Sequence, residues 1–348
     1  MLRIGVIGCG KIAQVRHLPE YAENPDVQIA ALADLNLERT KELAQRYGAK
    51  AYASDKELLA DPSIDAVSIC SANNSHAEMA IAALKAGKHV LCEKPMATTL
   101  EDCEAMVKAA EQAGKLLMID QNQRLAPAHQ KAREWIRAGK IGKPLTFRTR
   151  FAHGGPETWS VDQGSGTWFF DKKRAAMGAL ADLGVHKTDL IQFLLDQQVT
   201  EVTAFLSTLD KCFSDGSPIT VDDNALCVYK MSGGAVGTMT ASWTHYGSED
   251  NSTEIDGSEG ILRIYADPEH VLVLKRKDGT SEFWDGGAIQ TNDEQTNSGI
   301  IDLFVECLKN PSKEGIPAAS VLPAMRAVFA AMQSSEEGRA IRIKGTER

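Results

Sequence analysis

The sequence predicts an α/β protein of two domains, and three observations lead to this prediction. With 348 residues the chain is long enough for two domains that each bury a core. Up to about residue 120, short β-branched runs alternate with helical stretches, which is typical of parallel strands joined by right-handed crossovers. Further along, strand follows strand with turn signals between them, as at residues 232–234 and 257–258, which indicates a mostly antiparallel sheet.

We therefore predict a first domain over residues 1–122 with a doubly wound parallel sheet. Its strands are expected at residues 3–7, 28–34, 66–70, 89–92 and 116–119. Amphipathic helices over residues 76–86 and 100–113 are each followed by a glycine, Gly87 and Gly114, at the position where helices commonly stop. Five strands with helices between them make a sheet that is covered on both faces.

A second, α+β domain is expected over residues 123–348, with a large, mostly antiparallel open sheet. Its strands are predicted at residues 145–151, 199–207, 225–230, 235–245, 252–256, 261–265 and 271–275. Helices are predicted near residues 127–138, 180–195, 298–309 and 319–336. Alternation along residues 235–243 would leave one face of this sheet apolar, so we expect a homodimer or homotetramer to form through it.

The composition is that of an ordinary globular protein and excludes several classes. Apolar residues make up 43% and charged residues 24% of the chain, and no run approaches the roughly 18 apolar residues of a membrane span. The net charge of −9, without a basic run to reverse it locally, argues against nucleic acid as a partner. The first residues lack the features of a secretory signal, and the seven cysteines include no C-x-x-C pair, so the cytoplasm is the expected location.

A glycine-rich loop follows the first predicted strand. Residues 8–13 read G-x-G-x-x-A between a strand and a helical stretch, which is the context of the Rossmann dinucleotide fingerprint. Gly8 permits the tight turn, and Gly10 lets the backbone approach a pyrophosphate at the helix N-terminus. Lys11 and Ile12, which follow, complete the predicted contacts of this loop. The loop alone is weak evidence, because glycines also serve ordinary turns.

A carboxylate at the end of the second strand strengthens the cofactor prediction. Asp34 lies about where an acidic residue holds the adenosine ribose hydroxyls in dinucleotide-binding domains. A carboxylate there repels a 2′-phosphate, so NAD is favoured over NADP, although Arg39 on the following helix is able to reach such a phosphate. The alternative is that Asp34 only caps the helix that begins near Leu37.

Three further motifs occur in order along the chain. They are Asn-x-x-His at residues 73–76, Glu-Lys-Pro at residues 93–95 and Asp-x-x-x-His at residues 182–186. In their order and spacing the chain resembles the Gfo/Idh/MocA oxidoreductase family, which includes glucose–fructose oxidoreductase and inositol dehydrogenases, over nearly its whole length. The resemblance implies that Lys94 projects toward a substrate beside the nicotinamide. It also implies further cofactor contacts, at Ser71, Asn73, His76, Glu93, Lys94 and Asn122.

The chain departs from the family pattern at two places. Asp120 stands where the family usually has glycine, so the backbone there is expected to differ. Residues 175–178 read Ala-Ala-Met-Gly where relatives usually carry consecutive glycines, and the added bulk is expected to narrow or reshape the pocket.

The Asp-x-x-x-His motif and Lys94 fit the chemistry of alcohol oxidation, which requires a base for the hydroxyl proton and a cation beside the developing alkoxide. Asp182 and His186 share one helical face, where the carboxylate can orient the imidazole and favour its charged form. Following the family pattern, we expect His186 as general acid/base, Lys94 as electrostatic partner and proton relay, and Asp182 as acceptor for a substrate hydroxyl. Without the resemblance, a solvated lysine and a helix-surface Asp/His pair are the commoner interpretations.

The remaining predictions concern substrate contacts and metals. Substrate contacts are expected at Lys94, Arg124, His153, Trp168, Asp182 and His186. Trp168 and Trp159 lie in a glycine-rich stretch and could stack on a sugar ring, with plain packing as the alternative. The same Asp/His pair could begin a metal site, but no further cluster in the sequence completes a coordination shell, so no metal is expected.

Together these patterns predict an NAD(P)-dependent dehydrogenase that transfers hydride between nicotinamide and a secondary hydroxyl or keto carbon of a polyol, inositol or sugar. One alternative is an enzyme that keeps its cofactor bound and recycles it, as a sugar oxidoreductase or a redox-assisted glycosidase. Another is a non-catalytic regulator that binds dinucleotide. The presence of the complete proton-transfer set argues against the regulator, a choice that fold alone could not make.

Overall fold

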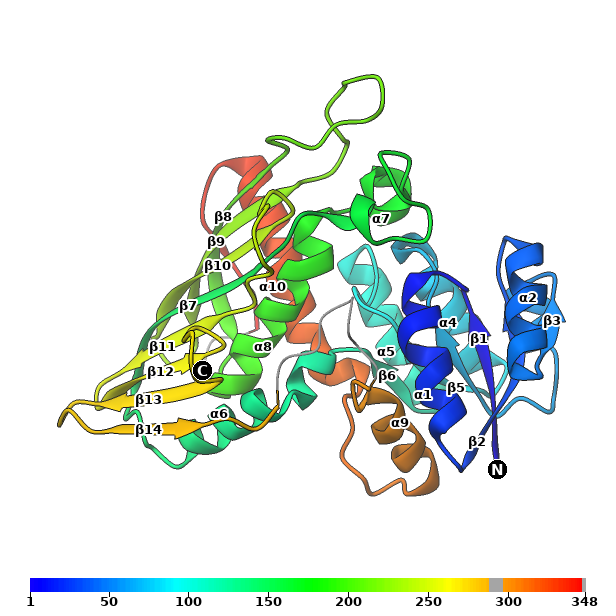
Figure 1. Ribbon diagram of the computed structural model, residues 1–348, viewed down its shortest axis with the longest axis horizontal. Coiled ribbons are helices and arrows are strands. Elements are labelled where there is room, and N and C mark those ends of the chain that lie inside the picture. Colours follow the sequence, from blue (N-terminus) through cyan, green and yellow to red (C-terminus); the bar gives the residue numbers. More distant parts are fainter. Residues whose placement is uncertain (288–296, 346–348) are drawn as a thin grey trace.

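The computed structural model describes residues 1–287 and 297–345, which form two sheets with helices between and around them (Figure 1). The first sheet has six parallel strands in the order β3-β2-β1-β4-β5-β6. The strands are β1 (Leu2–Ile7), β2 (Val27–Ala33), β3 (Lys50–Tyr52), β4 (Ala66–Ile69), β5 (His89–Cys92) and β6 (Leu117–Ile119). The predicted doubly wound sheet is confirmed, and the three-residue strand β3 is an addition to the five expected strands.

Because the strands of this sheet are mostly apolar and buried, both faces of the sheet are covered by helices. They are α1 (Leu18–Glu23), α2 (Leu37–Tyr47), α3 (Asp55–Leu59), α4 (His76–Lys85) and α5 (Leu100–Ala113). Strand β4 is buried along its whole length, as expected for a parallel strand between two helical layers. A π-helical segment, η1 (Ala13–His17), leads into α1 directly after the glycine loop.

The second sheet has nine strands in the order β14-β13-β12-β11-β7-β10-β9-β8-β15. Only the β7–β10 pair is parallel among these described strands, so the sheet is mostly antiparallel, as predicted. The strands are β7 (Pro144–Ala152), β8 (Val199–Ser207), β9 (Asn224–Met231), β10 (Val236–Ser242), β11 (Thr253–Gly257), β12 (Gly260–Ile264), β13 (Leu272–Arg276), β14 (Ser281–Trp284) and β15 (Ile341–Arg342). The short edge strands β14 and β15 were not predicted.

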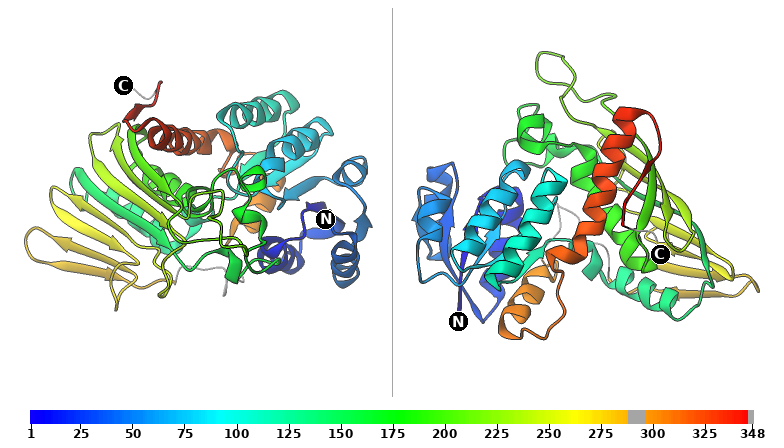
Figure 2. Two further views of the ribbon diagram at one scale, coloured as in Figure 1. Left: turned by 90° about the horizontal axis from the view of Figure 1, so that it is seen from above. Right: turned by 180° about the vertical axis from the view of Figure 1, so that it is seen from behind.

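Helices pack on one face of the second sheet, between it and the first domain (Figures 1 and 2). They include α6 (Pro127–Arg137), α8 (Val185–Leu195) and α10 (Ala318–Glu337). Along β9 buried residues alternate with exposed ones, because one side of the strand faces these helices and the other does not. None of the helices in the described ranges is both long and apolar enough to cross a membrane.

The last part of the chain returns to the first domain. Helix α9 (Ile300–Lys309) packs against α1, and Ile119 donates its backbone N–H to the carbonyl of Ile316 at 3.2 Å. A division at residue 122 therefore separates the two sheets. Helix α9 lies beyond this division in the sequence but contacts the first domain.

Candidate active site

A cavity of about 1120 Å³ lies between the two domains. The carboxyl ends of β1, β2, β4 and β5 open onto it, as is usual for ligand sites of doubly wound sheets. Most residues predicted to bind cofactor or substrate line this cavity: Gly8, Gly10, Lys11, Ile12, Asp34, Ser71, Asn73, Glu93, Lys94, Asn122, Trp168, Asp182 and His186. The remaining three, His76, Arg124 and His153, do not line it.

The glycine loop has room for a phosphate-bearing group. Gly8 has φ +93°, and a Cβ added there would come within 2.5 Å of the Cys70 backbone, so only glycine fits this turn. A Cβ on Gly10 would meet nothing within 4 Å, so this side of the loop faces open cavity. The helical segment that begins at Lys11 therefore presents its N-terminus to the cavity, which is a favourable place for a pyrophosphate.

Asp34 is held by the loop and does not cap α2. Its carboxylate accepts hydrogen bonds from the backbone N–H groups of Cys9 and Asn36, both at 2.7 Å. The side chain of Asn36 is the N-cap, accepting from the N–H of Arg39 at 3.1 Å, so the capping alternative for Asp34 is wrong. Arg39 also lines the cavity and forms an ion pair at 3.2 Å with Asp162 of the second domain.

Lys94 and Asp182 join the two domains at the cavity. The ammonium of Lys94 donates to the carbonyl of Asp182 at 2.8 Å and to its carboxylate at 3.0 Å. The other carboxylate oxygen accepts from the indole N–H of Trp243 at 3.0 Å. Because Asp182 has a fixed partner on each oxygen, it holds the ammonium at one place on the cavity wall.

His186 lies on the same wall, where its surroundings favour the neutral ring. Burial and the nearby Lys94 ammonium hold the pKa of His186 well below its usual value. The expectation that Asp182 favours the charged imidazole is wrong, because that carboxylate is engaged by Lys94 and Trp243. A π-helical segment, η6 (Leu180–Gly184), also replaces the regular turn that was expected between the two residues. A neutral imidazole is able to accept a proton.

The predicted cofactor residues His76, Asn73 and Glu93 hold the backbone around the site. The ring nitrogens of His76 lie 2.7 Å from the carbonyl of Pro95 and 3.1 Å from that of Ser71, so this ring braces two loops from behind. Asn73 donates to the carbonyl of Ala175 at 2.9 Å. Glu93 accepts from the backbone N–H of Lys94 at 3.1 Å.

Two of the predicted substrate contacts lie outside the cavity lining. Arg124 forms a two-pronged ion pair with Asp189, with N–O distances of 2.5 and 2.7 Å, and also donates to Ser320. His153 sits behind Asp182, at 3.8 Å, and its Nδ1 accepts from the N–H of Gly155. The guanidinium of Arg124 is therefore occupied, whereas Nε2 of His153 has no hydrogen-bond partner among the described residues.

Aromatic rings form another wall of the cavity. Trp159, Trp168 and Phe169 all line it and are half-buried. Trp168 and Phe169 are stacked with ring centroids 3.9 Å apart, and Trp159 meets Phe169 edge to face at 5.2 Å. Phe169 and Trp243 were not predicted as site residues, although the run Thr-Trp-Phe-Phe at residues 167–170 signals an aromatic cluster.

The Ala-Ala-Met-Gly segment shapes the site indirectly. Among these residues, neither Ala176 nor Met177 lines the cavity. Ala176 has φ +65°, a conformation that favours glycine. A Cβ on Gly178 would lie 1.7 Å from the carbonyl oxygen of Asp222, so this glycine is required by close packing.

Comparisons with known proteins agree with this geometry. Residues 2–121 match the family model described as "Oxidoreductase family, NAD-binding Rossmann fold", and residues 129–263 match the "GFO/IDH/MocA C-terminal domain". The chain is 30% identical to myo-inositol 2-dehydrogenase of Thermotoga maritima, with 99% of both chains covered. It is 33% identical to levoglucosan dehydrogenase of Pseudarthrobacter phenanthrenivorans, over 75% of this chain and 73% of that one.

A solved structure of levoglucosan dehydrogenase in complex with NADH and L-sorbose superposes with a TM-score of 0.87, at 26% identity and with 99% of each chain covered. The matched models together cover most of the chain, and the relative from Thermotoga maritima matches along its full length. The chain therefore belongs to the Gfo/Idh/MocA family of oxidoreductases.

Proposed function

We propose that this protein is an NAD-dependent dehydrogenase that oxidises a secondary hydroxyl group of a polyol, inositol or sugar. The observation that carries the proposal is that Lys94, from the first domain, and Asp182 and His186, from the second, line one cavity. Lys94 bonds Asp182 there, and its charge helps to lower the pKa of His186. The cavity continues from there to the glycine loop and Asp34, a path suited to a dinucleotide. The similar proteins named as inositol and levoglucosan dehydrogenases act on substrates of this class.

Each of the three residues has a distinct role in this proposal. Neutral His186 accepts the proton of the substrate hydroxyl, while the Lys94 ammonium stabilises the negative charge that develops on that oxygen. Asp182 fixes the ammonium and has remaining lone pairs for a neighbouring hydroxyl. When bound, the nicotinamide supplies the hydride acceptor.

NAD is proposed over NADP because of two carboxylates at the adenosine end of the cavity. Asp34 lines the cavity directly after β2, where the proposed NAD would place its ribose, and Asp162 pairs with the guanidinium of Arg39. A 2′-phosphate would be repelled by the carboxylate of Asp34 and would have to compete with Asp162 for the guanidinium of Arg39.

Enzymes that recycle a bound cofactor remain the second candidate, because the Arg39–Asp162 pair ties a loop of the second domain across the adenosine end. Net production of NADH in excess of enzyme separates the two candidates. A dehydrogenase produces it from a single substrate, whereas a recycling enzyme needs a second substrate to turn over.

The test of the proposed function is a panel of inositols, aldoses and glycosides, including levoglucosan, assayed for NADH at roughly 1 mM substrate. Activity that disappears in both Lys94→Ala and His186→Ala, with NAD still bound, supports the proposal. Undiminished activity in either variant contradicts the role of that residue.

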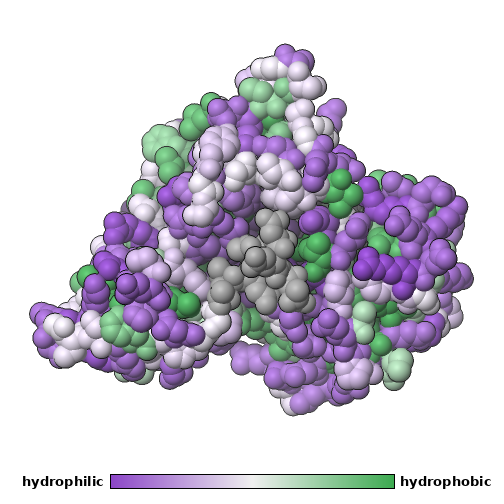
Figure 3. Space-filling model, in the orientation of Figure 1, coloured by the Kyte–Doolittle hydropathy of each residue, from purple (hydrophilic) through white to green (hydrophobic). Residues whose placement is uncertain are grey.

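We also propose that the protein forms a homodimer or homotetramer through the second sheet. The face away from the helices exposes an apolar cluster on three neighbouring strands: Phe205, Leu226, Val228 and Val236. Figure 3 shows hydrophobic side chains near β8 set among hydrophilic ones. Light scattering of the protein and of Leu226→Lys tests this proposal, which requires the mass to fall in the variant. The cytoplasmic location stays a prediction.

A further inference from the structure

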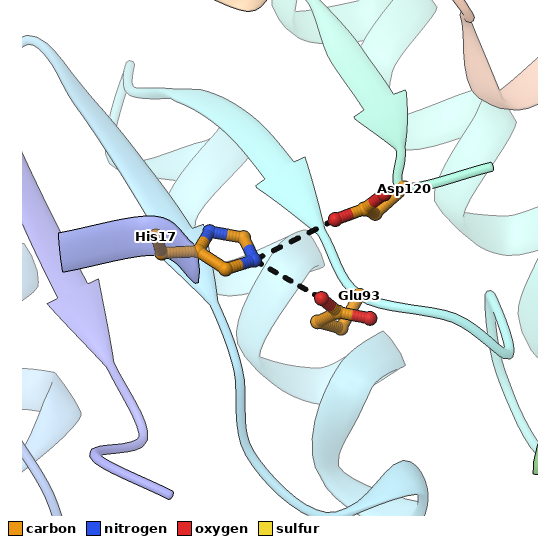
Figure 4. A group of neighbouring side chains, drawn as sticks. All are labelled: His17, Glu93 and Asp120. Carbon is orange, nitrogen blue, oxygen red and sulfur yellow. Dashed lines mark hydrogen bonds and ion pairs between the residues drawn. The ribbon is translucent and has the colours of Figure 1, made fainter. Parts of the chain in front are cut away.

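Beneath Lys94 lies a buried group of ionisable side chains that the proposed chemistry does not use. His17 follows the glycine loop, Glu93 follows β5 and Asp120 follows β6, and their ligand atoms all lie within 4.8 Å of one another (Figure 4). They are 0%, 5% and 0% exposed. Arg16, also buried, places its guanidinium 3.6 Å from Asp120.

Glu93 has a hydrogen-bond partner on each of its oxygens and lone pairs left on both. His17 Nε2 lies 3.0 Å from one oxygen, and the backbone N–H of Lys94 donates to the other at 3.1 Å. Behind the ring, His17 Nδ1 lies 3.2 Å from the hydroxyl of Ser68, which pairs with that of Tyr21 at 2.7 Å. These hydrogen bonds form a chain from Tyr21 to the backbone N–H of Lys94, and they help to fix the position of that backbone.

Asp120 is the unsatisfied member of the group. Among the described residues, neither of its oxygens has a donor within hydrogen-bond distance, and the nearest side-chain nitrogens, of Arg16 and His17, are 3.6 Å away. A buried carboxylate without donors is costly, and a second carboxylate beside it raises that cost. A proton held between Asp120 and Glu93 removes both costs.

The pKa values of the two carboxyl groups are shifted in opposite directions, which agrees with a proton on Asp120 and a charge on Glu93. Burial and then the charge of Glu93 raise the pKa of Asp120 to about 7, against the effect of Arg16 and His17. Burial also acts on Glu93, but the hydrogen bond and charge of His17, with the charges of Arg16 and Lys94, hold the pKa of Glu93 below its usual range. The thiols of Cys70 and Cys92 and the hydroxyl of Tyr21, which also face Asp120, have raised pKa values and stay neutral.

A metal ion is a poor occupant of this group. Arg16 already places a positive charge at Asp120, and a divalent cation would have to sit beside it in a buried site. With one proton on Asp120, the charges of Glu93 and Arg16 cancel.

We propose that Asp120 is a positioning residue that shares one proton with Glu93 and thereby couples the Glu93–Lys94 turn to pH. This role rests on the proposed dehydrogenase function. When Asp120 loses the proton, it competes with Glu93 for His17 and leaves a negative charge beneath Lys94. Because Lys94 is then less well positioned, turnover falls as the pH rises through neutrality.

The decisive variant is Asp120→Asn, because its amide can donate to Glu93 as the protonated acid does but cannot titrate. We expect kcat of the wild type to fall at least about threefold from about pH 6 to about pH 8, because Asp120 loses its proton over this range. The same profile should be flat in the variant. Glu20→Gln is the matched control, since that carboxyl is also buried and has a raised pKa, but it accepts from Ser298 outside the group. The control should retain the wild-type profile.

Infrared difference spectra of the protein without substrate test the shared proton separately from the proposed function. We expect a protonated-carboxyl band that titrates near neutrality in the wild type and in Glu20→Gln, and that is absent in Asp120→Asn. Persistence of the band in Asp120→Asn, or a stoichiometric metal ion in the purified protein, overturns the shared proton. Loss of the band with an unchanged pH profile of kcat overturns the positioning role. Absence of dehydrogenase activity from the wild type would instead count against the proposed function.

Discussion

Two buried ion pairs lie near the boundary between the domains, and they differ in what surrounds them. Lys94 pairs with Asp182 on the cavity wall, and Arg124 pairs with Asp189 away from the cavity lining. Both cations are mostly buried, with 17% and 13% of their side chains exposed. The two cations are therefore alike in burial and in having a carboxylate partner, but only Lys94 lines the cavity.

The partners of each cation also differ. The guanidinium of Arg124 is occupied by both oxygens of Asp189 and by Ser320, which leaves it little to offer a ligand. The ammonium of Lys94 has three donors, of which Asp182 takes two. The Arg124–Asp189 pair therefore stabilises the second domain internally, whereas the Lys94–Asp182 pair joins the two domains and, in the proposed function, also presents a charge to the substrate.

The largest expected effect is that of Lys94→Ala on turnover. Loss of the ammonium should lower kcat by about 10²- to 10⁴-fold, because the charge on the substrate oxygen is then uncompensated. NAD affinity should change far less, as measured by fluorescence titration. Lys88→Ala is the control, since that buried lysine donates only to the carbonyls of Asp61 and Ile64, outside the cavity. Equal losses of kcat in the two variants would contradict the role of Lys94.

Arg124→Ala should have the opposite profile. Removing the guanidinium leaves Asp189 buried without its cation, which should cost about 3–5 kcal/mol in the free energy of unfolding. Urea denaturation measures this loss, and adding Asp189→Asn should recover part of it. The folded fraction should retain kcat within a few fold. A large fall in kcat with unchanged stability would restore the predicted substrate contact at Arg124.

The two pairs also show how far the sequence could predict the site. The Asp-x-x-x-His and Glu-Lys-Pro motifs singled out Asp182, His186 and Lys94 through the resemblance to the family, and all three line the cavity. The partner of Arg124 could not be predicted, since Asp189 lies on α8, 65 residues further along the chain, and meets it only when the second domain folds. Short edge strands were missed for a related reason, because two to four residues carry no periodic signal of their own.

Local signals also left open choices that depend on exact geometry. Asp34 was able either to face a cofactor or to cap α2, and the choice is decided by the glycine loop, whose Cys9 N–H it accepts, while Asn36 caps the helix. The Asp120 departure was visible, but the buried group around it combines residues from three separate segments. In both cases the sequence identified the residue and the fold determined its contacts.

The adenosine end offers a third, more exposed pair for comparison. Asp34→Ser should weaken NAD relative to NADP, and Asp162→Asn should strengthen NADP binding by releasing Arg39 for a 2′-phosphate. Because the Asp162 side chain is 62% exposed, we expect only a change of several fold in its variant, about 1 kcal/mol or less. Dissociation constants for both cofactors measure this. An unchanged preference in Asp34→Ser would contradict the ribose assignment.

The smallest expected effect concerns an uncharged contact between the domains, that of Asn73 with the carbonyl of Ala175. The next residue, Ala176, adopts φ +65°, which glycine tolerates better than alanine. Ala176→Gly should therefore stabilise the protein slightly, by less than about 1 kcal/mol, because the relieved strain is partly offset by the greater freedom of the unfolded chain. Ala175→Gly is the control and should destabilise by about 0.5–1 kcal/mol, since Ala175 ends the helix α7 (Lys172–Ala175). If urea denaturation shows the same loss in both variants, the backbone at Ala176 is not strained. In either case kcat of Ala176→Gly should be unchanged, because Ala176 does not line the cavity.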